Sequence, residues 1–131
     1  MQKLLLPVIG ILTVVLASGC DSAKSSASVA NNVAVAQQQA TTQVSAAQKD
    51  AAKEIDSAAA KADHTPKDVD DAGAKASYEV AIAQADGDHN VAIQKCSALS
   101  GLALKSCKEQ ADASYEQAKT HANVIRLSKI Q

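Results

Sequence analysis

Two cysteines in the C-terminal half of the chain are the residues best suited to chemistry. Cys96 and Cys107 are 11 residues apart. On one unbroken helix they would lie about 16 Å apart, which exceeds the ~7 Å Cα–Cα limit of a disulfide. A disulfide therefore requires the chain to reverse direction between them, and Ser100-Gly101 lies at the midpoint, where glycine readily ends a helix. The spacing predicts an antiparallel helical hairpin joined by a disulfide next to its turn.

Three other states of this cysteine pair stay open, namely a redox couple, a metal site and free thiols. Redox couples more often have the Cys-x-x-Cys spacing, which lowers the pKa of one thiol. A metal would need His89 or His121 as a further ligand, and four-ligand zinc sites usually contain closely spaced cysteine pairs. The residues therefore favour a structural disulfide, and we expect neither a metal nor another cofactor.

The elements that position the cysteines are two long helices. Thr65 suits an N-cap, Pro66 the first helical position and Asp68 the third, so a helix is expected from Pro66 to about Leu99. Gly87 could bend it. A second helix is expected over 102–127. Counting outward from the turn predicts these pairs across the hairpin: Ala92 and Ile93 with Ala111, His89 with Ser114, Ala85 with Ala118, Ile82 with His121 or Ala122, and Tyr78 with Ile125.

An Ala-rich amphipathic helix is predicted before the hairpin, over 29–63. Its largest apolar residues, Val33, Val44 and Ile55, recur every 11 residues, a period close to that of a straight helix. Two further rows with the same period complete an apolar stripe: Ala36, Ala47 and Ala58, and Val29, Ala40, Ala51 and Ala62. The stripe could pack within the chain, but its small residues favour self-association or docking of a partner.

The N-terminus has the features of a secretory signal. Lys3 is followed by an apolar run over 4–16, interrupted by Pro7 and Gly10, and then by small residues. The run is shorter than the ~20 residues that a membrane-spanning helix needs. A small polar stretch over 20–28 then predicts a flexible tether.

Residues Leu16-Ala17-Ser18-Gly19-Cys20 resemble the lipobox of bacterial lipoproteins. The resemblance implies cleavage between Gly19 and Cys20, followed by acylation of the Cys20 thiol and amine. It also implies an anchor in an envelope membrane, with the protein facing the periplasm. Asp21 resembles an inner-membrane retention signal of enterobacteria, although an outer-membrane location stays open.

Two weaker resemblances concern the rest of the chain. The stretch 77–122, with Lys95-Cys96-x-x-Leu99-x-Gly101 and Cys107-Lys108-Glu109, resembles small Ala-rich proteobacterial envelope proteins, some of them labelled TolA-like. The chain is more distantly similar to murein lipoproteins. That family ends in a lysine joined to peptidoglycan, whereas this chain ends Lys129-Ile130-Gln131, so covalent attachment to peptidoglycan is not expected.

The composition and charge of the chain argue against some classes of function. Aromatic residues make up 2% of the chain and the formal net charge is −1, without a basic patch, so nucleic acid is not an expected partner. No catalytic motif is visible, and the chain is not expected to be an enzyme. The sequence predicts an all-α, lipid-anchored envelope protein with a structural or protein-interaction role. A small-ligand or metal-binding module and a thiol-redox protein are the alternatives.

Overall fold

The computed structural model describes residues 23–61 and 63–129, and every regular element in them is an α-helix. In chain order these are α1 (Ser26–Ala59), α2 (Pro66–Cys96) and α3 (Gly101–Lys129). The prediction of one long helix followed by an antiparallel hairpin is confirmed. The signal peptide predicted over 1–19 lies outside the described residues.

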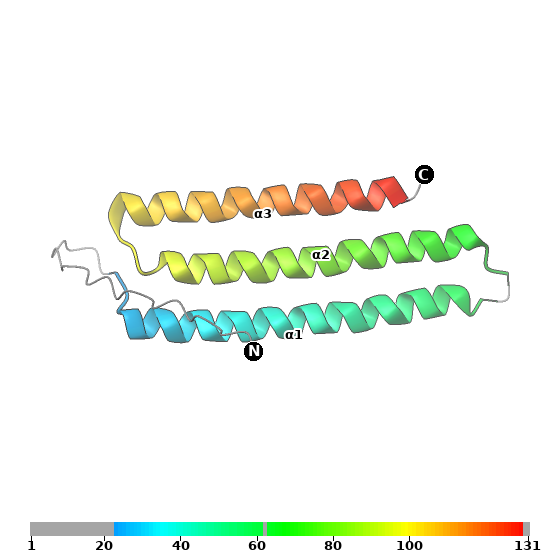
Figure 1. Cartoon of the computed structure of the whole chain (residues 1–131), viewed down its shortest axis with the longest axis horizontal. Helices are drawn as coiled ribbons and strands as arrows, with labels where there is room; N and C mark the ends of the chain where they lie inside the picture. The colour runs from blue at the N-terminus through cyan, green and yellow to red at the C-terminus, as the bar shows by residue number, and fades with distance from the viewer. Residues whose placement is uncertain (1–22, 62, 130–131) are drawn as a thin grey trace, which may run out of the picture.

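The three helices lie side by side in a single layer, with α2 in the middle (Figure 1). Both α1 and α3 pack on α2, and within the described residues they do not contact each other. Gly87 of α2 faces Ala40 of α1, whereas Cys96 is bonded to Cys107 of α3. Gly87 and Cys96 are separated by two and a half helical turns, so these contacts fall on opposite sides of α2. Because α1 and α3 pack on opposite sides of α2, the three helices form a flat layer.

The boundaries of α1 differ from the predicted range 29–63. The helix begins at Ser26 because the Ser25 hydroxyl caps it and accepts a hydrogen bond from the N–H of Ser28 (3.3 Å). It ends at Ala59, and the chain then turns. Residues 26–28 of the tether predicted over 20–28 are therefore helical, and residues 20–22 lie outside the described part of the chain.

The 11-residue stripe of α1 packs on α2 of the same chain. Its alanines at 36, 51 and 58 are buried, and its larger residues Val33, Val44 and Ile55 are half-buried. The stripe thus packs within the chain, and its self-association or docking of a partner stays a prediction. Small residues serve intramolecular packing well because they let two helices approach closely.

The start of α2 follows the sequence prediction. Thr65 is the N-cap, and its hydroxyl accepts a hydrogen bond from the N–H of Asp68, while the Asp68 carboxylate accepts one from the N–H of Thr65 (2.7 Å). The Thr65 hydroxyl also donates to this carboxylate (2.6 Å). These hydrogen bonds lower the pKa of Asp68 below its ordinary value.

The turn between α2 and α3 is longer than predicted. The middle helix ends at Cys96, earlier than the expected Leu99, and it runs through Gly87 as one continuous helix. Gly101 adopts a positive φ of 56°, as expected from its place in the turn, but it forms the start of α3 rather than the cap of α2. Cys96 is therefore the last residue of α2, and Cys107 lies six residues after the start of α3.

Small side chains form the whole buried interior of the described residues. The buried apolar residues are eight alanines and Cys96: Ala36, Ala51, Ala58, Ala74, Ala76, Ala85, Ala111, Ala122 and Cys96. Gly87 is buried with them. No helix in the described ranges is both long enough and apolar enough to cross a membrane.

We predict that two glycines of α2 respond in opposite ways to substitution by alanine. At Gly87 a new Cβ would lie 2.5 Å from the Ala40 Cβ and 3.1 Å from the Ala40 Cα, so Gly87→Ala should destabilise the fold by about 1–2 kcal/mol despite its higher helix propensity. At Gly73 nothing lies within 4 Å, so Gly73→Ala should stabilise by about 1 kcal/mol. Urea denaturation followed by circular dichroism measures both changes.

A compensating variant provides the control for this prediction. Removing the opposing methyl with Ala40→Gly should recover most of the stability lost in Gly87→Ala, because it restores the space between α1 and α2. If Gly87→Ala were as stabilising as Gly73→Ala, the close contact between these helices would be wrong.

Candidate interaction surface

The disulfide fixes α3 against the C-terminal end of α2. Cys96 and Cys107 are joined, with a Cα–Cα distance of 5.6 Å. Cys96 is almost completely buried, whereas Cys107 is half-buried. The structure thus supports the predicted pairing, which sets the register of the two helices.

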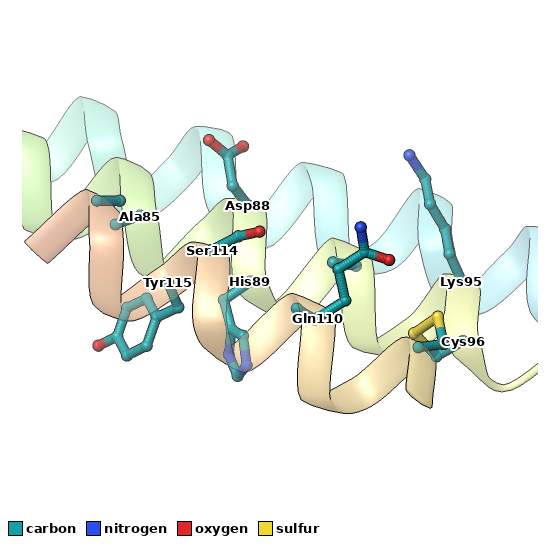
Figure 2. Close-up of a pocket in the computed structure, with 12 residues that line it drawn as sticks. Ala85, Asp88, His89, Lys95, Cys96, Gln110, Ser114 and Tyr115 are labelled. Atoms are coloured by element: carbon teal, nitrogen blue, oxygen red, sulfur yellow. A yellow bond between two sulfur atoms is a disulfide. The ribbon is translucent and has the colours of Figure 1, made fainter. Parts of the chain in front are cut away.

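A shallow groove runs along the α2–α3 contact next to the disulfide (Figure 2). Its volume is about 500 Å³. The disulfide and small side chains line it, among them the residues that sequence reasoning paired across the hairpin: Ala85, Ala92, Ala111 and Ala118. Because alanines fill so little of the space between two helices, the groove stays open along this line.

Polar side chains stand beside the groove on one face of the layer. Asp88 and Lys95 of α2 and Gln110 of α3 point to the same side of the helices (Figure 2). They offer one negative charge, one positive charge and an amide to whatever enters the groove.

A polar network on the opposite face connects α2 and α3. The ring of His89 stacks on the ring of Tyr115, with centroids 4.9 Å apart, and His89 Nε2 lies 2.7 Å from an Asp112 oxygen. The Tyr115 hydroxyl donates a hydrogen bond to Asp86. In Figure 2, His89 and Tyr115 point away from the side on which Asp88 and Lys95 stand.

The surroundings of the Tyr115 hydroxyl disfavour its ionisation. The pKa of Tyr115 is raised, mainly because its hydroxyl donates to the Asp86 carboxylate, which disfavours a negative phenolate. The Lys119 ammonium lies 4.4 Å from the centre of the Tyr115 ring, in cation–π geometry. The neutral phenol therefore links α3 to α2 through its hydrogen bond to Asp86.

Sequence reasoning missed this network. It placed His89 near Ser114, which lines the same groove and directly precedes Tyr115, but it assigned no partner to Tyr115. The predicted hairpin register contains the missing signal, since it brings Tyr115 level with the Asp86-Gly87-Asp88 segment. At the far end of the hairpin, the guanidinium carbon of Arg126, the residue after the expected Ile125, lies 4.9 Å from the centre of the Tyr78 ring.

The remaining predicted site residues are distributed as follows. Gly19, Cys20 and Asp21 lie outside the described residues, so the structure does not bear on them. Val33, Val44 and Ile55 face α2 along α1 and are not part of the groove. Among residues 23–61 and 63–129, no three side chains form a cluster that could hold a metal ion.

Several large apolar side chains remain exposed on the layer. Leu102 is 85% exposed at the start of α3, and Val124 is 57% exposed near its end. The others are Val35, Leu99, Ile125 and Leu127. In a chain whose buried interior is almost entirely alanine, these side chains are the largest apolar groups available for contact with another surface.

Comparison with known proteins gives no relative. No family model matches the chain, and no curated protein or solved structure shows significant similarity to it. Its function is therefore argued from its residues and its fold alone.

We predict that the disulfide provides a large part of the stability of the hairpin. Replacing both cysteines by alanine should lower the free energy of unfolding by roughly 3 kcal/mol, because the closed loop of about 12 residues restricts the unfolded chain. Urea denaturation with and without a reductant measures this effect.

The double alanine variant also controls for the action of the reductant. Reductant should lower the midpoint of the native chain to near that of Cys96→Ala/Cys107→Ala and leave the variant unaffected. If the variant had the same urea midpoint as the oxidised native chain, the alanine contacts alone would hold the hairpin.

Proposed function

We propose that this chain is a periplasm-facing lipoprotein, anchored to a membrane of the bacterial envelope through Cys20, with a structural or protein-interaction role rather than an enzymatic one. The lipobox resemblance at Leu16-Ala17-Ser18-Gly19-Cys20 supports the anchor. Asp21 resembles an inner-membrane retention signal and is consistent with an anchor in the inner membrane, with the outer membrane as the alternative.

The shape of the described chain is the observation that carries the interaction role. In a flat layer, both faces of α2 and the outer sides of α1 and α3 stay open, so that a small protein presents a large surface. The groove of about 500 Å³ and the exposed leucines and valines lie on that surface. Such a surface suits contact with other envelope proteins better than enclosure of a substrate.

The disulfide agrees with a location outside the cytoplasm. Disulfides persist in the periplasm and are rare in the reducing cytosol. The bond between Cys96 and Cys107 therefore supports export, which the secretory signal over 1–19 also predicts. A structural bond of this kind favours the interaction role over the redox alternative.

The anchor is tested by following the processing of the N-terminus. Treating cells with a signal peptidase II inhibitor should cause the precursor to accumulate, and Cys20→Ala should prevent lipidation and release the product from the membrane fraction. Mass spectrometry of the N-terminal peptide identifies the attached acyl groups. Normal processing and membrane attachment of Cys20→Ala would contradict the proposal.

The interaction role is tested by crosslinking in living cells. A photoreactive amino acid at Gln110, which lines the groove, should capture a specific envelope protein that mass spectrometry can identify. The same probe at Gln38, an exposed position on α1, serves as the matched control. If the two positions captured the same proteins with equal yield, the groove would have no special role in recognition.

A further inference from the structure

One end of the layer gathers three segments that are far apart in the sequence. The start of α1, the end of α2 and the start of α3 meet there (Figure 1). The N–H of Lys24 donates a hydrogen bond to the carbonyl of Ser97 (3.1 Å), which ties the segment before α1 to the turn between α2 and α3. We call this end the hairpin tip and define it by residues 23–25 and 93–108.

The hairpin tip is close to the predicted lipid anchor. Cys20 precedes Lys24 by four residues, and a fully extended chain of that length spans at most about 14 Å. Whatever holds Cys20 in a bilayer therefore holds the hairpin tip near the bilayer surface. This step rests on the proposed lipid anchor.

Exposed leucines occupy the hairpin tip. Leu102 is 85% exposed, the highest value among the exposed large apolar residues, and Leu99 is 40% exposed. Leu99 also lines a hollow of about 250 Å³ together with Ile93 and Leu104. The hairpin tip thus presents apolar groups at the place where a membrane interface would be.

Lysines surround these leucines, and the nearest acid in sequence, Glu109, lies just beyond the hairpin tip and pairs with Lys105 (3.8 Å). The described stretches 23–49 and 89–108 contain lysines but neither aspartate nor glutamate. Lys24 and Lys108 line the hollow next to Leu99, and Lys95 and Lys105 are exposed nearby in sequence. The hairpin tip is therefore basic in a chain whose formal net charge is −1.

The helix dipoles add to this positive charge. Two helices, α1 and α3, begin at the hairpin tip, and neither has an acidic residue in its first turn. At the other end of the layer, α2 begins with Asp68 in its first turn. The N-terminus of a helix carries a partial positive charge and its C-terminus a partial negative one. The starts of α1 and α3 therefore outweigh the single end of α2 at the hairpin tip and reinforce the lysines.

We propose that the hairpin tip docks on the surface of an anionic phospholipid bilayer. Leu99 and Leu102 enter the interface, while the lysines beside them lie at the phosphates of the headgroups. Apolar residues flanked by lysines are the combination that binds peripheral proteins to anionic membranes. The lipid anchor and the hairpin tip then form two points of attachment, and the layer stands away from the membrane with its far end in the periplasm.

A tryptophan reporter tests this docking, because the chain contains no tryptophan of its own. The full-length protein is purified from the membrane and reconstituted into vesicles of phosphatidylglycerol and phosphatidylethanolamine. The fluorescence of Leu102→Trp should shift to the blue and be quenched by brominated acyl chains. The matched control is Val124→Trp, which is exposed near the other end of the same helix and should show neither effect.

The basic residues are tested in the same Leu102→Trp background. The blue shift should be lost in phosphatidylcholine vesicles, in 1 M salt, where the Debye length is about 3 Å, and in Lys105→Gln/Lys108→Gln. The control Lys49→Gln/Lys53→Gln removes two lysines of α1 outside the hairpin tip and should keep the shift.

Defined results would overturn the docking proposal. One is equal emission from Leu102→Trp and Val124→Trp on anionic vesicles. Another is a blue shift of Leu102→Trp that is as large on neutral vesicles as on anionic ones. A third is a blue shift without vesicles, which would report self-association. Mass spectrometry of Cys20 in the same sample tests the lipid anchor separately. If Cys20 carries no lipid, the anchor fails, and adding the protein to preformed anionic vesicles still tests the hairpin tip through the same fluorescence.

Discussion

The backbone of Gly87 lies so close to α1 that a Cβ at this position would come within 2.5 Å of the Ala40 Cβ. Contacts between small residues continue along both sides of α2 and determine how closely the three helices approach. Each buried alanine removes little apolar area from water, and apolar burial stabilises by only ~25 cal/mol per Å². Long helices compensate for this, since each adds many small contacts in a row. Length is therefore a physical requirement of this fold.

Contacts outside the alanine stripes hold the layer in register. Lys75 of α2 forms an ion pair with Glu54 of α1 (2.6 Å), which raises the pKa of the lysine mainly through this hydrogen bond. On the other side of α2, the network around Tyr115 and the Cys96–Cys107 bond fix α3. Exposed ion pairs contribute little individually, so the disulfide is the strongest single tie to α3. Hence the flat layer combines weak, distributed apolar contacts with one covalent bond next to a turn.

Much of the fold could be predicted from the sequence because its signals are local or periodic. The 11-residue rows of α1, the cap at Thr65 and the cysteine spacing each determine a helix, a boundary or a chain reversal. The sequence alone did not show what covers the α1 stripe, since an apolar stripe has the same pattern whether it meets its own chain or another. It also gave Gly87 the role of a bend, because its close contact with Ala40 depends on a residue distant in sequence. The basic hairpin tip likewise becomes apparent only when Lys24 is seen next to the turn between α2 and α3.

The central claim is that α2 separates α1 from α3, which leaves the faces and the hairpin tip of the layer open. A triangular three-helix bundle would cover part of these surfaces. The most direct test is a distance measurement by electron spin resonance between labels on Gln38 of α1 and Glu116 of α3, both of which are exposed. The flat layer predicts distances that correspond to helix axes about 16–20 Å apart, which is twice the usual spacing of packed helices. Distances that correspond to axes only about 8–10 Å apart would mean that α1 and α3 pack on each other, and would contradict the account.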